Sequence, residues 1–118
     1  MRIIPLTAIV VVAINSAAQV LAAPATPKQE DAISSAIKDT LLDPDSAQLS
    51  GIETAISPNG TLSACGYINA KNAYGGYTGK APFFGSFRGE TFDVRSIAQD
   101  RDSTYQVINR CQMIGLLQ

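Results

Sequence analysis

The feature that most limits how this chain can fold is its cysteine content, because Cys65 and Cys111 are the only two cysteines in 118 residues. Two cysteines allow a single intramolecular pairing, so a disulfide between them would fix one contact of the fold. A closed loop of about 46 residues stabilises a small domain by about 4 kcal/mol in the chain-entropy treatment. A free reactive thiol or a metal ligand is the alternative, but the chain holds no histidine and no C-x-x-C pair. The disulfide requires an oxidising compartment.

The N-terminal segment predicts export to such a compartment. Its sequence, MRIIPLTAIVVVAINSAAQVLAAPATP, places Arg2 before an apolar run over residues 3–14, and small residues follow. This order is typical of a secretory signal peptide. An apolar helix of about twelve residues spans roughly 18 Å, which is less than the ~30 Å hydrocarbon core of a bilayer. We therefore predict no stable membrane insertion after cleavage, and an uncleaved N-terminal anchor is the alternative.

The small residues place the predicted cleavage site after Ala22, with Val20 and Ala22 at the two recognised positions. A cut one residue later is disfavoured because Pro24 would follow the scissile bond directly. Residues 1–22 are thus predicted to be a signal peptide. Residues 23–118 are predicted to form a single small domain of 96 residues (118 − 22 = 96).

The charge balance excludes two classes of partner. Without Arg2, eight cations face ten acids, which gives a net charge of −2 (9 − 1 − 10 = −2) with no basic cluster in the sequence. Nucleic acid is excluded as a partner because neutralising its phosphates requires concentrated Lys and Arg. A polybasic contact with an anionic membrane surface is excluded for the same reason.

The first element of the domain is predicted to be a helix from Pro27 to near Leu42. Thr26 and Gln29 fit a capping box, and proline suits the first helical position. Pro44 ends the helix because it disfavours helical backbone at the residue before it. One buried stripe at helical spacing is formed by Ile33, Ala36, Ile37 and Leu41.

The last element is predicted to be a second helix within the sequence DSTYQVINRCQMIG (residues 102–115). Ser103 and Gln106 fit a capping box, and Gly115 suits the C-terminal cap. Cys111 lies on the buried stripe, so its bond to Cys65 would staple this helix to the sheet. That stripe comprises Thr104, Val107, Ile108, Cys111 and Ile114.

The region between the helices predicts an antiparallel sheet. Extended segments are expected at residues 47–56, 61–70, 82–88 and 90–97. The sequence SPNG fits a type I turn between the first two, and the second has partly apolar faces, which favours a central position. Pro82 is expected at a strand start or a sheet edge. The predicted fold class is α+β: an N-terminal helix, a three- or four-stranded antiparallel sheet, a C-terminal helix and one disulfide.

The glycine-aromatic segment, NAKNAYGGYTGKAPFFG (Asn69–Gly85), is the main candidate for a binding site. It is not a P-loop, because tyrosine stands at the first glycine position and alanine at the hydroxyl position. A dinucleotide-binding fingerprint fails at Thr78. Carbohydrate binding is one interpretation, since aromatic faces and a few polar groups line such sites. The alternative is architectural, with glycines in a turn and aromatics in the core. The candidate aromatic faces are Tyr74, Tyr77, Phe83 and Phe84, and the candidate polar contacts are Asn69, Asn72 and Lys80.

No catalytic residue, metal site or cofactor is predicted. The chain lacks histidine, which is the most frequent general acid or base. Its carboxylate pairs occur at predicted turns or element starts, where capping or solvated residues are expected. These pairs are Asp43/Asp45, Glu90/Asp93 and Asp100/Asp102.

Two segments, LLDPDSAQ (residues 41–48) and CGYINAKNAYGGYTGKAPFFG (residues 65–85), together resemble a family of small exported bacterial envelope proteins and lipoproteins. The shared patterns are D-P-x-S-A and C-G-x-x-N-x-K-N-x-x-G-G-Y-x-G. The resemblance implies a helix followed by an antiparallel sheet in a bacterial envelope protein. It implies no activity, because the family is functionally uncharacterised. This chain departs from the lipoprotein members by lacking their acylated cysteine, so the resemblance does not imply a membrane tether.

The functional prediction is a non-enzymatic module, periplasmic or secreted, that binds a component of the bacterial envelope. The expected partner is an envelope glycan or protein, contacted through Asn69, Asn72, Tyr74, Tyr77 and Lys80. One alternative is a small cell-wall hydrolase that uses paired carboxylates, which would have to face each other across a cleft. The other is an inhibitor of an exogenous hydrolase, which would need an exposed rigid loop.

Overall fold

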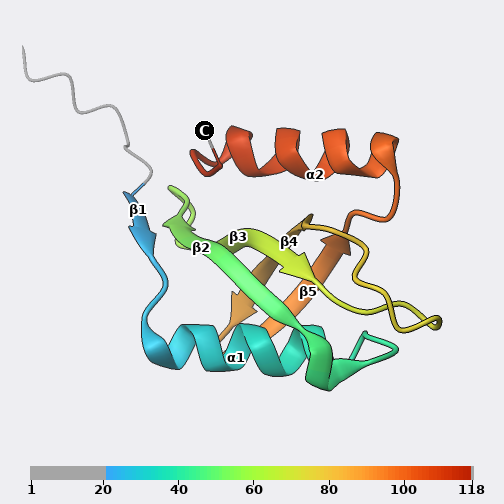
Figure 1. Cartoon of the computed structure of the whole chain (residues 1–118). Helices are drawn as coiled ribbons and strands as arrows, with labels where there is room; N and C mark the ends of the chain where they lie inside the picture. The colour runs from blue at the N-terminus through green and yellow to red at the C-terminus, as the bar shows by residue number, and fades with distance from the viewer. Residues whose placement is uncertain (1–20, 118) are drawn as a thin grey trace, which may run out of the picture.

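The computed structural model describes residues 21–117, so most of the predicted signal peptide lies outside the described residues. The chain forms an α+β fold with one disulfide, as predicted (Figure 1). Its elements, in order, are β1 (Leu21–Pro24), α1 (Pro27–Lys38), the 3-10 helix η1 (Pro44–Ser46), β2 (Gln48–Ile56), β3 (Leu62–Asn69), β4 (Ala81–Arg88), β5 (Thr91–Ile97) and α2 (Arg101–Met113).

The sheet is an antiparallel meander whose strands lie in the order β1-β2-β3-β4-β5. It has five strands rather than three or four, because β1 pairs with the end of β2. The four other strands and the central position of β3 were predicted. The turn at Ser57–Gly60 is also confirmed, since the Gly60 N–H donates to the Ser57 carbonyl at 2.8 Å. Pro82 is the second residue of β4, a strand start inside the sheet.

The two helices cover opposite faces of the sheet, which gives a three-layer arrangement (Figure 1). On the α1 face, Ile33 and Ile37 are fully buried against Phe83 and Phe92. The rings of these two phenylalanines meet edge to face, with centroids 6.3 Å apart. Because a helix covers each face, β3 and β4 are apolar on both sides, as expected for internal strands.

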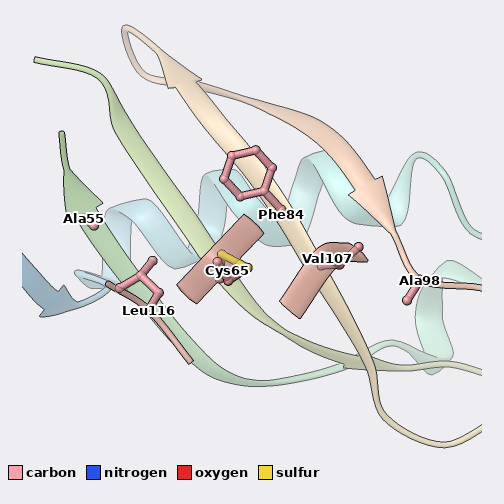
Figure 2. Packing of buried hydrophobic residues seen from close by; sticks show 7 residues of the cluster. Ala55, Cys65, Phe84, Ala98, Val107 and Leu116 are labelled. Atoms are coloured by element: carbon pink, nitrogen blue, oxygen red, sulfur yellow. A yellow bond between two sulfur atoms is a disulfide. The ribbon is translucent and has the colours of Figure 1, made fainter. Parts of the chain in front are cut away.

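The disulfide lies at the centre of the other layer. Cys65 on β3 and Cys111 on α2 are bonded, with their Cα atoms 6.1 Å apart, and both are fully buried. Figure 2 shows Cys65 among Phe84, Val107 and Leu116 on this face of the sheet. The bond ties α2 to the central strand, as predicted from the sequence.

Two glycines allow side chains to pack directly on the α1 face of the sheet. A Cβ atom at Gly66 would lie 2.9 Å from the Phe83 ring, and one at Gly85 would overlap the Phe92 ring. Contacts this short essentially never occur between real Cβ atoms and their neighbours, so a side chain at either position would force the facing ring to shift.

The helix termini differ from prediction in two places. Helix α1 ends at Lys38 rather than near Leu42, because the backbone N–H groups of Thr40 and Leu41 donate three residues back, to Ile37 at 2.9 Å and to Lys38 at 3.2 Å, instead of four. The Thr40 hydroxyl also donates to the Ile37 carbonyl, at 2.7 Å. The N-cap of α2 is Asp100 rather than Ser103, and Ser103 is instead the third helical residue of that capping box.

The C-terminal end of α2 is as predicted. Gly115 has a φ of 84°, and its N–H donates to the Gln112 carbonyl. The Leu116 N–H donates to the Cys111 carbonyl at 2.9 Å, which completes a Schellman motif. Within residues 21–117, no helix is both long and apolar enough to cross a bilayer.

Candidate functional site

The loop between β3 and β4 (residues 70–80, the β3–β4 loop) is shaped by Asn72. Its N–H donates to the Gly76 carbonyl at 2.9 Å, and its carbonyl accepts from the Gly75 N–H at 3.0 Å. Its Oδ1 accepts from the backbone N–H groups of Tyr74 (2.9 Å) and Gly76 (3.3 Å). A short amide side chain suits this position because it replaces a backbone acceptor in a tight turn. Gly75 has a φ of 79°, which favours glycine.

The base of the loop is closed by Asn69. Its Oδ1 accepts from the Gly79 N–H at 3.0 Å, while the Thr78 N–H donates to the Ala70 carbonyl at 3.2 Å. The predicted contacts Asn69 and Asn72 therefore use their amide oxygens to hold the loop backbone. The loop is a hydrogen-bonded structure rather than a free connection, so its backbone is held in one conformation.

The aromatic residues of the segment divide into two groups. Tyr74 is 97% exposed and Tyr77 is 46% exposed, whereas Phe83 is 0% and Phe84 is 7% exposed. Lys80 is exposed as well. The architectural interpretation is correct for the two phenylalanines, which belong to the core because β4 is covered on both faces. The interpretation of Phe83 and Phe84 as ligand-facing platforms is wrong, whereas Tyr74, Tyr77 and Lys80 all face solvent.

The β3–β4 loop is anchored to the turn that follows α1. The Lys71 N–H donates to Oγ of Ser46 at 2.9 Å, and Ser46 in turn donates to the Asp43 carbonyl at 2.7 Å. The two loops lie on the same side of the molecule (Figure 1). Lys71 also pairs with Tyr77, whose ring centroid lies 5.6 Å from Nζ. The two segments that carry the family resemblance therefore meet in space.

A groove opens between these loops, the end of β5 and the start of α2. Its volume is about 710 Å³. Three cations line it, Lys71, Lys80 and Arg95, and we call it the basic groove. Asp100 is the one acid among its lining residues, and Leu42, which is 81% exposed, stands at its rim.

Sequence reasoning did not identify Lys71, Arg95 and Leu42 as site residues. Lys71 stands in the quoted K-N pattern, which was a usable signal. Arg95 gave no signal, because it is a single cation within a strand. It faces the groove at an irregularity, since Phe84 pairs with Ser96 but the next residue of β4 pairs with Val94. Such a bulge redirects a side chain and depends on tertiary pairing.

The hydrolase alternative requires two carboxylates that face each other across a cleft, so the positions of the acidic residues test it. A second hollow of about 610 Å³ between α1 and β5 is lined by Asp39, Glu90 and Asp93. Arg95 lines both this hollow and the basic groove. Glu90 pairs with Lys28 at 2.6 Å, and Asp93 pairs with Arg88 at 2.9 Å. These carboxylates share a hollow, but both members of the predicted Glu90/Asp93 pair already face a cation. Within residues 21–117, no group of three or more acids, cysteines or histidines is placed to hold a metal ion.

Asp100 serves as a helix cap. Its Oδ1 accepts from the Ser103 N–H at 2.7 Å and from the Ser103 hydroxyl at 2.8 Å. These hydrogen bonds stabilise the ionised form and lower the pKa of Asp100 below its usual 3.8. A general acid requires the opposite shift, so Asp100 is suited to capping rather than to proton donation.

Comparison with protein-family models, curated proteins and solved structures finds no match to this chain.

Proposed function

We propose that this protein is a non-enzymatic binding module of the bacterial envelope, periplasmic or secreted, that contacts a glycan or protein through the β3–β4 loop. The observation that carries the proposal is the joint exposure of Tyr74, Tyr77 and Lys80 on a loop held by its own hydrogen bonds. A buried loop would have left only an architectural role.

Exposed tyrosines on an ordered loop suit recognition for two reasons. Tyrosine offers a large flat surface with a polar end, and it is enriched at binding interfaces. A loop that is already ordered loses less conformational entropy when a partner binds. Asn69 and Asn72 contribute to binding in this proposal mainly by holding the loop in its bound conformation.

The compartment is part of the proposal. A buried disulfide fits an oxidising compartment, which agrees with the signal-like order of the N-terminal residues. The resemblance to exported envelope proteins points the same way. Fractionation of the native host that places the chain in the cytoplasm with Cys65 and Cys111 reduced would contradict this assignment.

The direct experiment is retention on an envelope extract. The double variant Tyr74→Ala/Tyr77→Ala should lose retention while its disulfide and circular dichroism spectrum remain unchanged, because both side chains are exposed. Tyr105→Ala is the matched control, since Tyr105 is 56% exposed on α2 and lies outside the loop. Equal retention of the wild type and the double variant would refute the proposal.

The hydrolase alternative has one observation in its favour, which is the hollow shared by Glu90 and Asp93. It predicts that purified protein releases soluble fragments from cell-wall material and that Glu90→Gln/Asp93→Asn abolishes this release. We rank it second because each carboxylate is held in an ion pair.

The inhibitor alternative uses the same exposed loop. It differs in its partner: a hydrolase rather than a glycan would be recovered with the wild type and lost with the Tyr74→Ala/Tyr77→Ala variant.

A further inference from the structure

The basic groove is positive although the whole chain carries a net charge of −1. Lys71, Lys80 and Arg95 line it against the single acid Asp100, a balance of +2 (3 − 1 = 2). Arg95 also lines the second hollow, whose ion-paired acids face Lys28 and Arg88 rather than Arg95. The sequence shows no basic cluster, because these cations come from the β3–β4 loop and from β5 and are brought together only by the fold.

The groove cations have no carboxylate partners in the part of the chain that the structure describes. The ion pairs there are Lys28–Glu90 and Arg88–Asp93, both away from the groove lining. The carboxylate of Asp100 accepts from Ser103 and is committed to capping α2. Positive charge in the groove is therefore left to interact with something outside the chain, and a concave site strengthens such a field.

The apolar part of the groove restricts the ligand further. Leu41 and Leu42 line it beside Ile97 and Ala98, and Leu42 is largely exposed. Tyr77 stands next to it, because its ring lies against the side chain of the groove residue Lys71. A volume of about 710 Å³ holds one or two small rings rather than a folded segment.

We infer that the basic groove binds an acidic saccharide unit, meaning a sugar that carries a carboxylate or a phosphate. The anionic group would lie between Lys80 and Arg95, and the apolar face of the sugar ring would lie toward Leu42 and Tyr77. This inference rests on the proposed function and specifies its ligand class.

The test measures binding of the exported chain to three soluble polysaccharides by isothermal titration calorimetry. Polygalacturonate supplies carboxylates, phosphomannan supplies phosphates, and dextran is neutral. We expect at least one anionic polymer to bind and dextran not to bind. Binding should weaken as salt rises from about 0.1 M to about 1 M, because the screening length falls from about 10 Å to about 3 Å. The anionic polymer that binds identifies the charged group, and failure of both overturns the inference.

Charge variants locate the site. Lys80→Gln/Arg95→Gln should weaken binding roughly ten-fold or more, because charge-assisted hydrogen bonds to the anion are lost. Both side chains are exposed, so the fold should survive. Lys38→Gln/Lys28→Gln is the matched control, since it removes the same charge outside the groove. An equal loss in the control variant would refute binding in the groove.

The experiments distinguish binding by the β3–β4 loop from binding of an acidic saccharide in the basic groove. If envelope retention depends on Tyr74 and Tyr77 but is unchanged in Lys80→Gln/Arg95→Gln, the loop binds a partner and the acidic-saccharide inference is wrong. If the anionic polymers bind through Lys80 and Arg95 while the tyrosine variant keeps full retention, the groove binds its ligand and the role assigned to the loop is wrong.

Discussion

Removal of the disulfide should destabilise the domain by an amount that the structure fixes. Cys65 and Cys111 close a loop with a sequence separation of 46. The chain-entropy treatment assigns to such a loop about 13.5 cal/mol/K, which is about 4 kcal/mol at 25 °C. For a domain of this size we expect the melting temperature to fall by roughly 20 °C.

The assay is urea unfolding of the oxidised wild type and of the variant Cys65→Ala/Cys111→Ala. The free energy of unfolding should fall by about 4 kcal/mol, and the dependence on urea should steepen because the unfolded chain becomes more expanded. Wild type that is unfolded, reduced and returned to buffer serves as a control that keeps both sulfur atoms. Both sulfurs are fully buried, so a mild reductant should not cleave the bond in the native state. A loss of less than about 1 kcal/mol in both the double variant and the reduced wild type would refute the view that loop closure dominates.

Two further predictions concern packing and capping. Gly85→Ala should lower the free energy of unfolding by about 1–3 kcal/mol in the same assay, because the added methyl group overlaps the Phe92 ring; an unchanged urea midpoint would contradict this close approach. The lowered pKa of Asp100 means that its ionised cap contributes stability above the unfolded pKa, and this contribution is lost as the pH falls through the folded pKa. Asp100→Asn keeps a capping side chain that does not titrate, so the melting temperature of this variant should fall less than that of the wild type as the pH drops below about 4. An equal fall of both melting temperatures would contradict the role of ionised Asp100 as the cap.

Most of the fold was predictable because its signals are local. The cap at Thr26, the turn at Ser57–Gly60 and the left-handed Gly115 each depend on a few adjacent residues. The end of α1 was missed because Leu41 continues the apolar stripe, whereas the backbone of Thr40 and Leu41 has left the α-helical pattern and the Thr40 hydroxyl also bonds the Ile37 carbonyl. A stripe records which side chains are apolar and does not record competition for backbone carbonyls.

The candidate site was predictable only in part. Tyr74, Tyr77 and Lys80 stood out because they lie among glycines in a segment between two strands. Phe83 and Phe84 follow them closely, and composition alone does not separate a ring in a loop from a ring in a strand. The boundary at Ala81, where β4 begins, decides which rings are buried.

The basic groove could not be predicted from the sequence, because its cations do not form a local pattern. Arg95 lies at an irregular pairing between β4 and β5, and it lines the same groove as Lys80 only because of the fold. A search of the sequence for runs of Lys and Arg therefore misses this kind of anion site.

The predicted cleavage site lies inside strand β1. Leu21 and Ala22 pair with the end of β2, yet the predicted cleavage after Ala22 assigns them to the signal peptide. This assignment is the reason that sequence reasoning expected no strand here. After such a cut, Ala23 and Pro24 would still lie beside β2, and the Ala23 carbonyl would still accept from Oγ1 of Thr54, at 3.2 Å in the uncut chain. Ala22, Ala23 and Pro24 of β1 are exposed, so the cleaved domain should keep its fold with a four-stranded sheet and a short N-terminal extension.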